Sequence, residues 1–352
     1  MLLLKPDRLT ILTTSQCTAR CAHCCMNSGP ERKGERLTFE QIRDTVTSLH
    51  SLNSLQVVIF AGGEPTLLGE DLLESIAYID SLGIATRMVT NASWAVTPKK
   101  AHYMLISLRE AGLREINFSV DDYHLPYISF EKVENAWFAS KGLGFQSVVL
   151  ANCWGDRSTL TPQYIMDRLG EELPQRFDDE GDSLPIASPS SDGTIYMLSN
   201  STIQNIGRSH EELDSADIPY PDSQEVLNVG CPWAVKSAAL SPKNHLVSCC
   251  GIEAENNEVL DFGDASSTPA SELVRFADNQ VIVNAISIFG LVYLKNFIQE
   301  RNSNIPFREK YASVCEVCEH IVTRPECVEV LRQNSGELAA NVLAVREALG
   351  DK

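Results

Sequence analysis

Basic residues are scarce in this chain of 352 amino acids. Its 29 Lys and Arg residues are outnumbered by 47 Asp and Glu residues, which gives a formal net charge of −18. This balance excludes binding to nucleic acids or anionic membranes by bulk electrostatics, because like charges repel. We therefore expect no nucleic-acid partner. A basic partner would suit the charge, although most such charge is only a solvated surface.

Long apolar segments are also missing. The stretch MLLLKPDRLT at the start lacks the apolar core and cleavage site of a secretory signal. The most apolar run, 281–294, is too short to cross a bilayer and contains Asn284, so we expect a buried helix there and no membrane partner. These absences predict a cytoplasmic protein. In that reducing compartment its eleven cysteines are metal ligands or core residues rather than disulfides.

The chain has no internal repeat beyond an alternation of apolar runs with amphipathic stretches. Runs rich in β-branched and aromatic residues indicate buried strands at 9–14, 55–62, 84–90, 114–120, 145–151 and 194–200. Helical stretches follow most of them. Thr38 and Gln41 can form a capping box, and Thr-Pro pairs at 97–98 and 161–162 can start two more helices. This order predicts an α/β fold with a parallel sheet, either an incomplete six-unit barrel or an open doubly wound sheet.

The alternation fades after about residue 175. Residues 175–193 are acidic and rich in Ser and Pro, which indicates a loop, and 215–225 form a second break. We therefore expect a β/α domain over 1–210, a linker over 211–227, a small Cys-rich α+β domain over 228–330 and a C-terminal helix over 331–352.

Four cysteines gather in CTARCAHCC, directly after the first predicted strand. Cys17, Cys21 and Cys24 have the spacing C-x3-C-x2-C and lie at the edge of a parallel sheet where active sites form. Three thiolates on one loop can ligate three irons of a [4Fe–4S] cluster and leave the fourth open. Zinc stays a second reading, because His23 could supply a fourth ligand. Cys25 could replace Cys24, but we favour a buried thiol that binds nothing.

This loop resembles the C-x3-C-x-Φ-C motif of the radical S-adenosylmethionine (SAM) family, with His23 at the usually aromatic Φ position. FAGGEP at 60–65, after the second strand, matches the family's Gly-Gly-Glu-Pro motif. The resemblance covers about residues 8–210. It implies a partial (β/α)6 barrel in which Cys17, Cys21 and Cys24 hold a [4Fe–4S] cluster that binds SAM.

Further roles follow from the resemblance residue by residue. Gly62 and Gly63 let the backbone approach the methionyl group of SAM, and Glu64 accepts a hydrogen bond from its ammonium group. Polar contacts to SAM are expected at Asn91 and Ser119, although capping a helix explains these two as well. The residues assigned to SAM binding are His23, Gly62, Gly63, Glu64, Asn91, Ser119 and Arg208.

The run VDDYH at 120–124 follows the fourth predicted strand. Its residues Asp122, Tyr123 and His124 are candidates for substrate contacts or proton donors. Capping of a following helix explains the acidic residues almost as well.

A second cysteine group lies in the last third of the chain. Residues 230–251 indicate a hairpin with thiols at both ends, and CEVC follows later, which resembles the SPASM or shorter twitch extension of radical SAM enzymes. The candidate ligands of an auxiliary [4Fe–4S] cluster are Cys231, Cys249, Cys250, Cys315, Cys318 and Cys327. One complete cluster needs Cys231, either Cys249 or Cys250, Cys315 and Cys318; a zinc ribbon is the alternative. We expect Cys153 to lie in the core.

The resemblance implies an enzyme that reductively cleaves SAM to a 5′-deoxyadenosyl radical, which abstracts a hydrogen atom from a substrate. A flavodoxin or ferredoxin would supply the electron. Family members with such extensions often crosslink, epimerise or oxidise ribosomally made peptides, so a peptide substrate is our leading hypothesis, although no leader-binding domain precedes the barrel. The alternatives are a small-molecule substrate, activation of a glycyl-radical partner, and a non-catalytic metal-binding protein.

Overall fold

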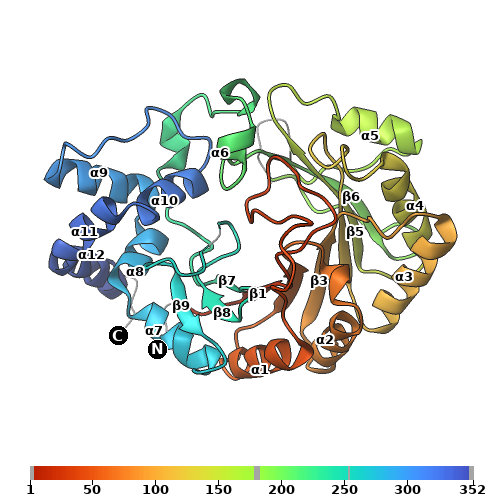
Figure 1. Cartoon of the computed structure of the whole chain (residues 1–352), viewed down its shortest axis with the longest axis horizontal. Coiled ribbons are helices and arrows are strands. Elements are labelled where there is room, and N and C mark those ends of the chain that lie inside the picture. Colours follow the sequence, from red (N-terminus) through yellow and green to blue (C-terminus); the bar gives the residue numbers. More distant parts are fainter. Residues whose placement is uncertain (1–3, 178–182, 253, 349–352) are drawn as a thin grey trace.

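One curved sheet organises the chain (Figure 1). The computed structural model describes residues 4–177, 183–252 and 254–348. Within them nine strands pair in the order β6-β5-β4-β3-β2-β1-β7-β8-β9. The strands are β1 (Arg8–Leu12), β2 (Val57–Ala61), β3 (Ala85–Thr90), β4 (Glu115–Ser119), β5 (Ser147–Trp154), β6 (Ile195–Thr202), β7 (Ser237–Leu240), β8 (His245–Val247) and β9 (Asp261–Asp264).

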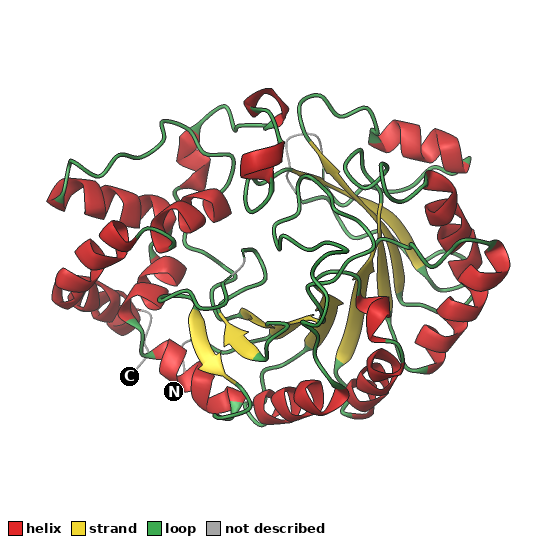
Figure 2. Ribbon diagram, viewed as in Figure 1, coloured by secondary structure: helices red, strands yellow, loops and turns green. Residues whose placement is uncertain are grey.

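The first six strands are parallel to one another, and each contains apolar positions that are fully buried. Helices cover the outer face of this half of the sheet, while loops fill its inner side (Figure 2). The helices of this half are α1 (Phe39–His50), α2 (Glu70–Ser81), α3 (Pro98–Glu110), α4 (Phe130–Ser140), α5 (Pro162–Leu169) and the short α6 (Ser209–Glu212). The predicted α/β fold with a partial six-unit barrel is therefore confirmed.

Local sequence signals start the helices where they were predicted. Thr38 and Gln41 form the reciprocal capping box of α1, with the Gln41 N–H donating to Thr38 Oγ1 and the Thr38 N–H donating to Gln41 Oε1. Thr97 and Thr161 cap α3 and α5, each followed by proline. Short 3₁₀ turns fill three connections: η1 (Pro65–Leu68), η2 (Ser215–Asp217) and η3 (Gln224–Leu227).

The C-terminal part extends the same sheet. β7 pairs in parallel with β1, and β7, β8 and β9 then pair antiparallel, which confirms the predicted hairpin. Six helices follow: α7 (Ala270–Asp278), α8 (Val281–Ile288), α9 (Leu291–Arg301), α10 (Val314–Val322), α11 (Pro325–Gln333) and α12 (Ser335–Ala348). The predicted domain boundaries stay predictions, since β7 joins the hairpin to the barrel sheet without a break. Residues 178–182 of the predicted loop and 349–352 of the predicted C-terminal helix lie outside the described residues.

The apolar run 281–294 is not the single helix that we expected. It breaks between α8 and α9 at Gly290, whose φ is +83°. A Cβ at Gly290 would overlap the carbonyl oxygen of Val229, so a close backbone approach requires glycine there. Among the described residues, no helix combines the length and apolar character needed to cross a membrane.

Candidate functional site

A cavity of about 380 Å³ lies at the carboxyl ends of the barrel strands. Residues of β2 to β6 and of the loop after β1 contribute to its wall, as expected for a fold that gathers its strand ends at one edge. The lining includes Cys17, Cys21, His23, Cys24 and Cys25 after β1, Gly62 and Gly63 after β2, Thr90 and Asn91 at β3, Ser119 at β4, Cys153 at β5, and Ser201 and Thr202 at β6. Cys153 therefore lies in the cavity wall rather than in the core.

The three predicted cluster ligands share this cavity. The loop turns back on itself where the Cys24 N–H donates to the Cys21 carbonyl, at 3.1 Å. Burial raises the pKa of Cys17 to about 12, so a thiolate at this position needs a cation close by. Three thiols on one buried loop around a cavity fit an iron–sulfur cluster, which supplies that cation.

The two motif glycines pack the second loop against the cysteine loop. A Cβ at Gly62 would lie 2.9 Å from the backbone nitrogen of Thr13, and one at Gly63 would overlap the carbonyl of Gln16. The Gly63 N–H donates to Thr14 O at 2.7 Å. Glycine is thus required here by contact between two loops, and the same residues line the cavity.

Glu64 does not face the cavity. Its carboxylate is fully buried and accepts hydrogen bonds from the Thr66 N–H and hydroxyl, the Thr90 hydroxyl and the Asn91 N–H, at 2.7–3.3 Å. Burial raises the pKa of Glu64 above its usual value. In this arrangement Glu64 caps η1 and ties it to the end of β3, while its expected contact with the ammonium group of SAM stays a prediction.

The other residues assigned to SAM divide into two groups. Asn91 and Ser119 line the cavity, and Asn91 Nδ2 lies 3.0 Å from Thr18 Oγ1 on the cysteine loop. Arg208 lies behind that loop instead, 4% exposed, and its guanidinium donates to the carbonyls of Cys21 and Ser28 at 2.9 and 2.7 Å. Its placement makes Arg208 a residue that shapes the cysteine loop rather than one that lines the cavity.

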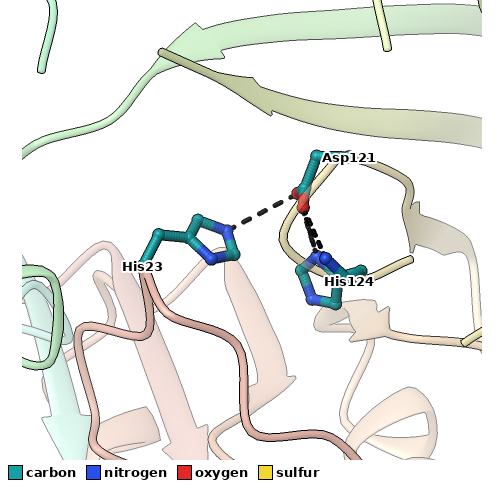
Figure 3. A group of neighbouring side chains, drawn as sticks. All are labelled: His23, Asp121 and His124. Carbon is teal, nitrogen blue, oxygen red and sulfur yellow. Dashed lines mark hydrogen bonds and ion pairs between the residues drawn. The ribbon is translucent and has the colours of Figure 1, made fainter. Parts of the chain in front are cut away.

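A buried carboxylate joins two imidazoles at the cavity wall (Figure 3). Asp121, 2% exposed, lies between His23 and His124. The His124 Nδ1 lies 2.8 and 2.9 Å from the two carboxylate oxygens, and the His23 Nε2 lies 3.5 Å from one of them. Burial opposes ionisation, but the two imidazoles hold the pKa of Asp121 well below its usual range. Burial likewise opposes protonation of His124, yet Asp121 raises the pKa of His124 well above its usual value.

These three residues have ligand types that could hold a metal ion. Hydrogen bonds explain how the Asp121 carboxylate can be buried without a bound metal ion. One Asp121 oxygen also accepts from the backbone N–H groups of Tyr123 and His124, at 3.0 and 2.9 Å, in addition to the imidazole. Because an ionised carboxylate only accepts, the His124 Nδ1 that faces it carries the proton.

Of the three predicted catalytic candidates, only His124 lines the cavity. Asp122 turns away and accepts from the N–H groups of Thr159 and Leu160, both at 2.9 Å, so it holds the loop after β5. The Tyr123 ring packs on the His23 ring, with their centroids 4.8 Å apart. Asp121 belongs to the same VDDYH run, but its burial between the two imidazoles could not be read from the sequence.

The second cysteine group forms around α10. Cys315 and Cys318 lie three residues apart on this helix, and a Cβ at Gly251 would lie 3.6 Å from the Cys315 sulfur and 3.8 Å from the Cys249 sulfur. Cys231, Cys249, Cys315 and Cys318 lie close enough for the charge of each to interact with the other three. Burial raises the pKa of Cys249 and Cys315 to about 12.

Two cysteines remain outside the favoured ligand sets. Cys327 is fully buried in the core on α11, where its charged neighbours are Arg324 and Glu326. Cys25, which we expected to be a buried bystander, interacts with Cys24 on one side and with Cys250 and Cys315 on the other. Cys25 thus lies near members of both thiol groups, a proximity across more than 200 residues that local spacing does not reveal.

The helix that carries the second group also holds the segment behind the cysteine loop. Glu316, 1% exposed, accepts from Asn205 Nδ2 at 2.6 Å. Glu319 accepts from the Gly207 N–H at 3.2 Å and pairs with His210 at 2.6 Å. Because Arg208 follows Gly207 directly, α10 and the cysteine loop are connected through this one segment.

Comparisons with known proteins agree with this geometry. Residues 11–136 match the family model described as the radical SAM superfamily. The chain is 28% identical over 127 residues to the peptide biosynthesis protein YydG of Bacillus subtilis, covering 36% of this chain and 40% of that protein. It is 29% identical over 114 residues to the PqqA peptide cyclase of Bradyrhizobium diazoefficiens, covering 32% of this chain and 28% of that enzyme.

The matched stretches span less than half of each of these relatives. Among solved structures, anSMEcpe with bound AdoMet and the Cp18Cys peptide superposes with a TM-score of 0.51 at 13% identity, over 96% of this chain and 99% of that chain. This likeness concerns the fold. Together with the cysteine loop and the glycine motif, the family match identifies residues 11–136 as a radical SAM domain.

Proposed function

We propose that this chain is an iron–sulfur enzyme that cleaves SAM reductively and uses the resulting 5′-deoxyadenosyl radical to abstract a hydrogen atom from a ribosomally made peptide. The observation that carries the proposal is the cavity wall: the three thiols of the cysteine loop and the glycine motif, which lie more than 35 residues apart in the chain, meet in it. When bound there, the cluster and SAM supply the electron transfer and the radical.

The chain's own residues bind and orient the cluster and SAM. Cys17, Cys21 and Cys24 ligate the cluster, and the polar side chains of Asn91 and Ser119 face the cavity to contact SAM. Glu64 and Arg208 act as positioning residues, because one fixes the end of β3 and the other fixes the cysteine loop. His23 and His124 supply hydrogen-bonding groups at the cavity wall, held in place by Asp121.

The mutual proximity of Cys231, Cys249, Cys315 and Cys318 supports a single auxiliary [4Fe–4S] cluster at α10. We assign Cys249 rather than Cys250 to this set, since Cys249 interacts with the other three members. A flavodoxin or ferredoxin from the same reducing compartment is the electron donor that suits both clusters.

The names of the two relatives support a peptide as the substrate class, since one is a peptide biosynthesis protein and the other a peptide cyclase. The test is anaerobic reconstitution of the full chain with iron and sulfide, followed by a chemical reductant, SAM and synthetic peptides that tile the short reading frames flanking the gene. We expect 5′-deoxyadenosine in every reaction and a mass or isotope change in one peptide.

Two controls make this assay decisive. Cys21→Ala should abolish 5′-deoxyadenosine, whereas Cys327→Ala, which removes a thiol outside both groups, should retain it. Absence of 5′-deoxyadenosine from the iron-loaded wild type would refute the proposed SAM-cleaving activity. Production of 5′-deoxyadenosine with no change in any peptide would refute the proposed peptide substrate and favour a small-molecule substrate.

A further inference from the structure

Two carboxylates on α10 alternate with the two thiols of this helix. In the sequence CEVCE, Glu316 follows Cys315 directly and Glu319 follows Cys318. Successive residues of a helix are turned by about 100°, so the thiols and the carboxylates form adjoining stripes on α10. A shift of the helix that brings its thiols to a ligand therefore moves its carboxylates as well.

Both carboxylates bind residues 205–208, which we call the linking segment. Glu316 accepts from the Asn205 side chain at 2.6 Å and Glu319 from the Gly207 N–H at 3.2 Å. Because Glu316 is 1% exposed, its hydrogen bond is made away from water, where such bonds are strong. Asn205 and Gly207 have φ angles of +50° and +59°, a left-handed backbone that these contacts hold in place.

The linking segment also fits closely against the cysteine loop. The Arg208 N–H donates to the Cys24 carbonyl at 3.1 Å, and the guanidinium binds two more carbonyls of the loop. A Cβ at Gly207 would lie 2.6 Å from the carbonyl oxygen of Cys25 and 2.8 Å from that of Cys24, so only glycine allows this close approach. A displacement of the linking segment therefore displaces the backbone of a predicted cluster ligand.

The two thiol groups thus share one neighbouring element. In Figure 1 the linking segment is the green stretch before α6, between the blue α10 and the red loop after β1. Two sites influence each other when both of them bias the position of such an element. Hydrogen bonds join the linking segment to α10, and close backbone packing joins it to the cysteine loop.

We propose that Glu316 and Glu319 are positioning residues through which the second thiol group, when it holds its cluster, fixes the cysteine loop in the form that binds SAM. This inference rests on the proposed function, because it assigns both thiol groups to iron–sulfur clusters. The auxiliary cluster ties the two thiols of α10 to Cys231 and Cys249, which lie outside this helix, and so fixes its position. The affinity for SAM therefore reports the state of a site in another part of the chain.

A double-mutant cycle in the reconstituted full chain tests this coupling. Cys249→Ala removes a cluster ligand outside α10, and Glu319→Ala removes the contact with the linking segment. Each should raise the Kd for labelled SAM in equilibrium dialysis roughly tenfold, and the double variant should raise it no further. Glu319→Gln keeps an acceptor for the Gly207 N–H and should restore the Kd. Glu329→Ala is the matched control, because Glu329 lies on the neighbouring α11 and accepts from Gln333.

Hydrogen exchange gives a readout that needs neither SAM nor activity. In a variant with alanine at Cys17, Cys21 and Cys24, iron loading of the second thiol group should slow amide exchange in the linking segment and the cysteine loop. Adding Glu319→Ala should remove this effect. Bound iron that leaves exchange unchanged, or Kd effects that are absent or add in the double variant, would overturn the inference while the proposed function stands. A triple variant without iron would overturn the auxiliary cluster and the inference together, and a wild type that binds no SAM would also overturn the proposed function.

Discussion

The His124 imidazole donates from Nδ1 to both carboxylate oxygens of Asp121, at 2.8 and 2.9 Å, in a position where the carboxylate is 2% exposed. A buried charge is stable only when it is paired, and here the same carboxylate also faces the His23 ring on the cysteine loop. This one side chain thus joins the end of β4 to the loop that carries the three predicted ligands. Removal of the Asp121 carboxylate should therefore destabilise both the end of β4 and the cysteine loop.

The pH dependence of stability tests this pair. Asp121, whose pKa is lowered, contributes stability above its ordinary value of 3.8 and loses it as the pH falls toward the folded pKa. His124, whose pKa is raised, contributes fully below 6.5 and loses its share as the pH rises through the folded pKa. Asp121→Asn should therefore lower the Tm most between about pH 4 and 6.5, by the equivalent of roughly 3 kcal/mol, and less at pH 9.

Asp122→Asn is the matched control, because it removes the neighbouring carboxylate, whose partners include the N–H groups of Thr159 and Leu160 and no imidazole. Its effect on the Tm should be the same at pH 5 and pH 9. A pH-independent loss in Asp121→Asn, measured by scanning calorimetry of the full chain, would show that the carboxylate acts only as a turn residue.

Glu64 gives a second prediction. Glu64→Ala leaves four donors, two of them buried, without an acceptor, so it should lower the free energy of unfolding by about 2–5 kcal/mol. Glu64→Gln keeps one carbonyl oxygen and should lose less. Chemical denaturation measures the first effect, and equilibrium dialysis with labelled SAM measures binding. Unchanged stability in Glu64→Ala, together with a raised Kd for SAM, would restore the direct ammonium contact that the motif suggests.

Glu64 also illustrates what the sequence could and could not predict. The motif placed this residue on the correct loop, because strand order and turn chemistry are local signals. The direction of its side chain depends on Thr90 and Asn91 at the end of another strand, which only the folded sheet brings close. The kink at Gly290 has a similar cause, since it follows from contact with the distant backbone of Val229.

The thiols show the same division. The spacing of Cys17, Cys21 and Cys24 predicted one shared loop, and the structure brings them to one cavity. No periodicity relates Cys25 to Cys250 or Cys315, because their proximity depends on how the hairpin and α10 pack against the barrel. Spacing finds ligands within a loop, while ligands drawn from several elements require the three-dimensional structure.

The register of the cysteine loop is testable with single substitutions. Alanine at Cys17, Cys21 or Cys24 should each abolish 5′-deoxyadenosine formation, since the loss of one thiolate leaves the cluster without a ligand. Cys25→Ala should retain it, because we expect Cys25 to be a buried thiol that binds no iron of this cluster. The product is quantified by chromatography after anaerobic reconstitution, with iron content measured in parallel. Activity in Cys24→Ala and none in Cys25→Ala would assign the third ligand to Cys25.

The auxiliary group can be isolated by removing the first one. A variant with alanine at Cys17, Cys21 and Cys24 should bind about four irons per chain after reconstitution, held by Cys231, Cys249, Cys315 and Cys318. Adding Cys249→Ala should reduce this iron, because a four-ligand set loses a member. Adding Cys250→Ala to the triple variant instead should leave the iron in place. The two four-fold variants make a matched pair, because each removes one of two adjacent thiols. Iron and zinc are counted by mass spectrometry of the metals, and the cluster by its visible absorption. Zinc in place of iron would establish the ribbon, and equal iron in both variants would show that either neighbour can serve as the ligand.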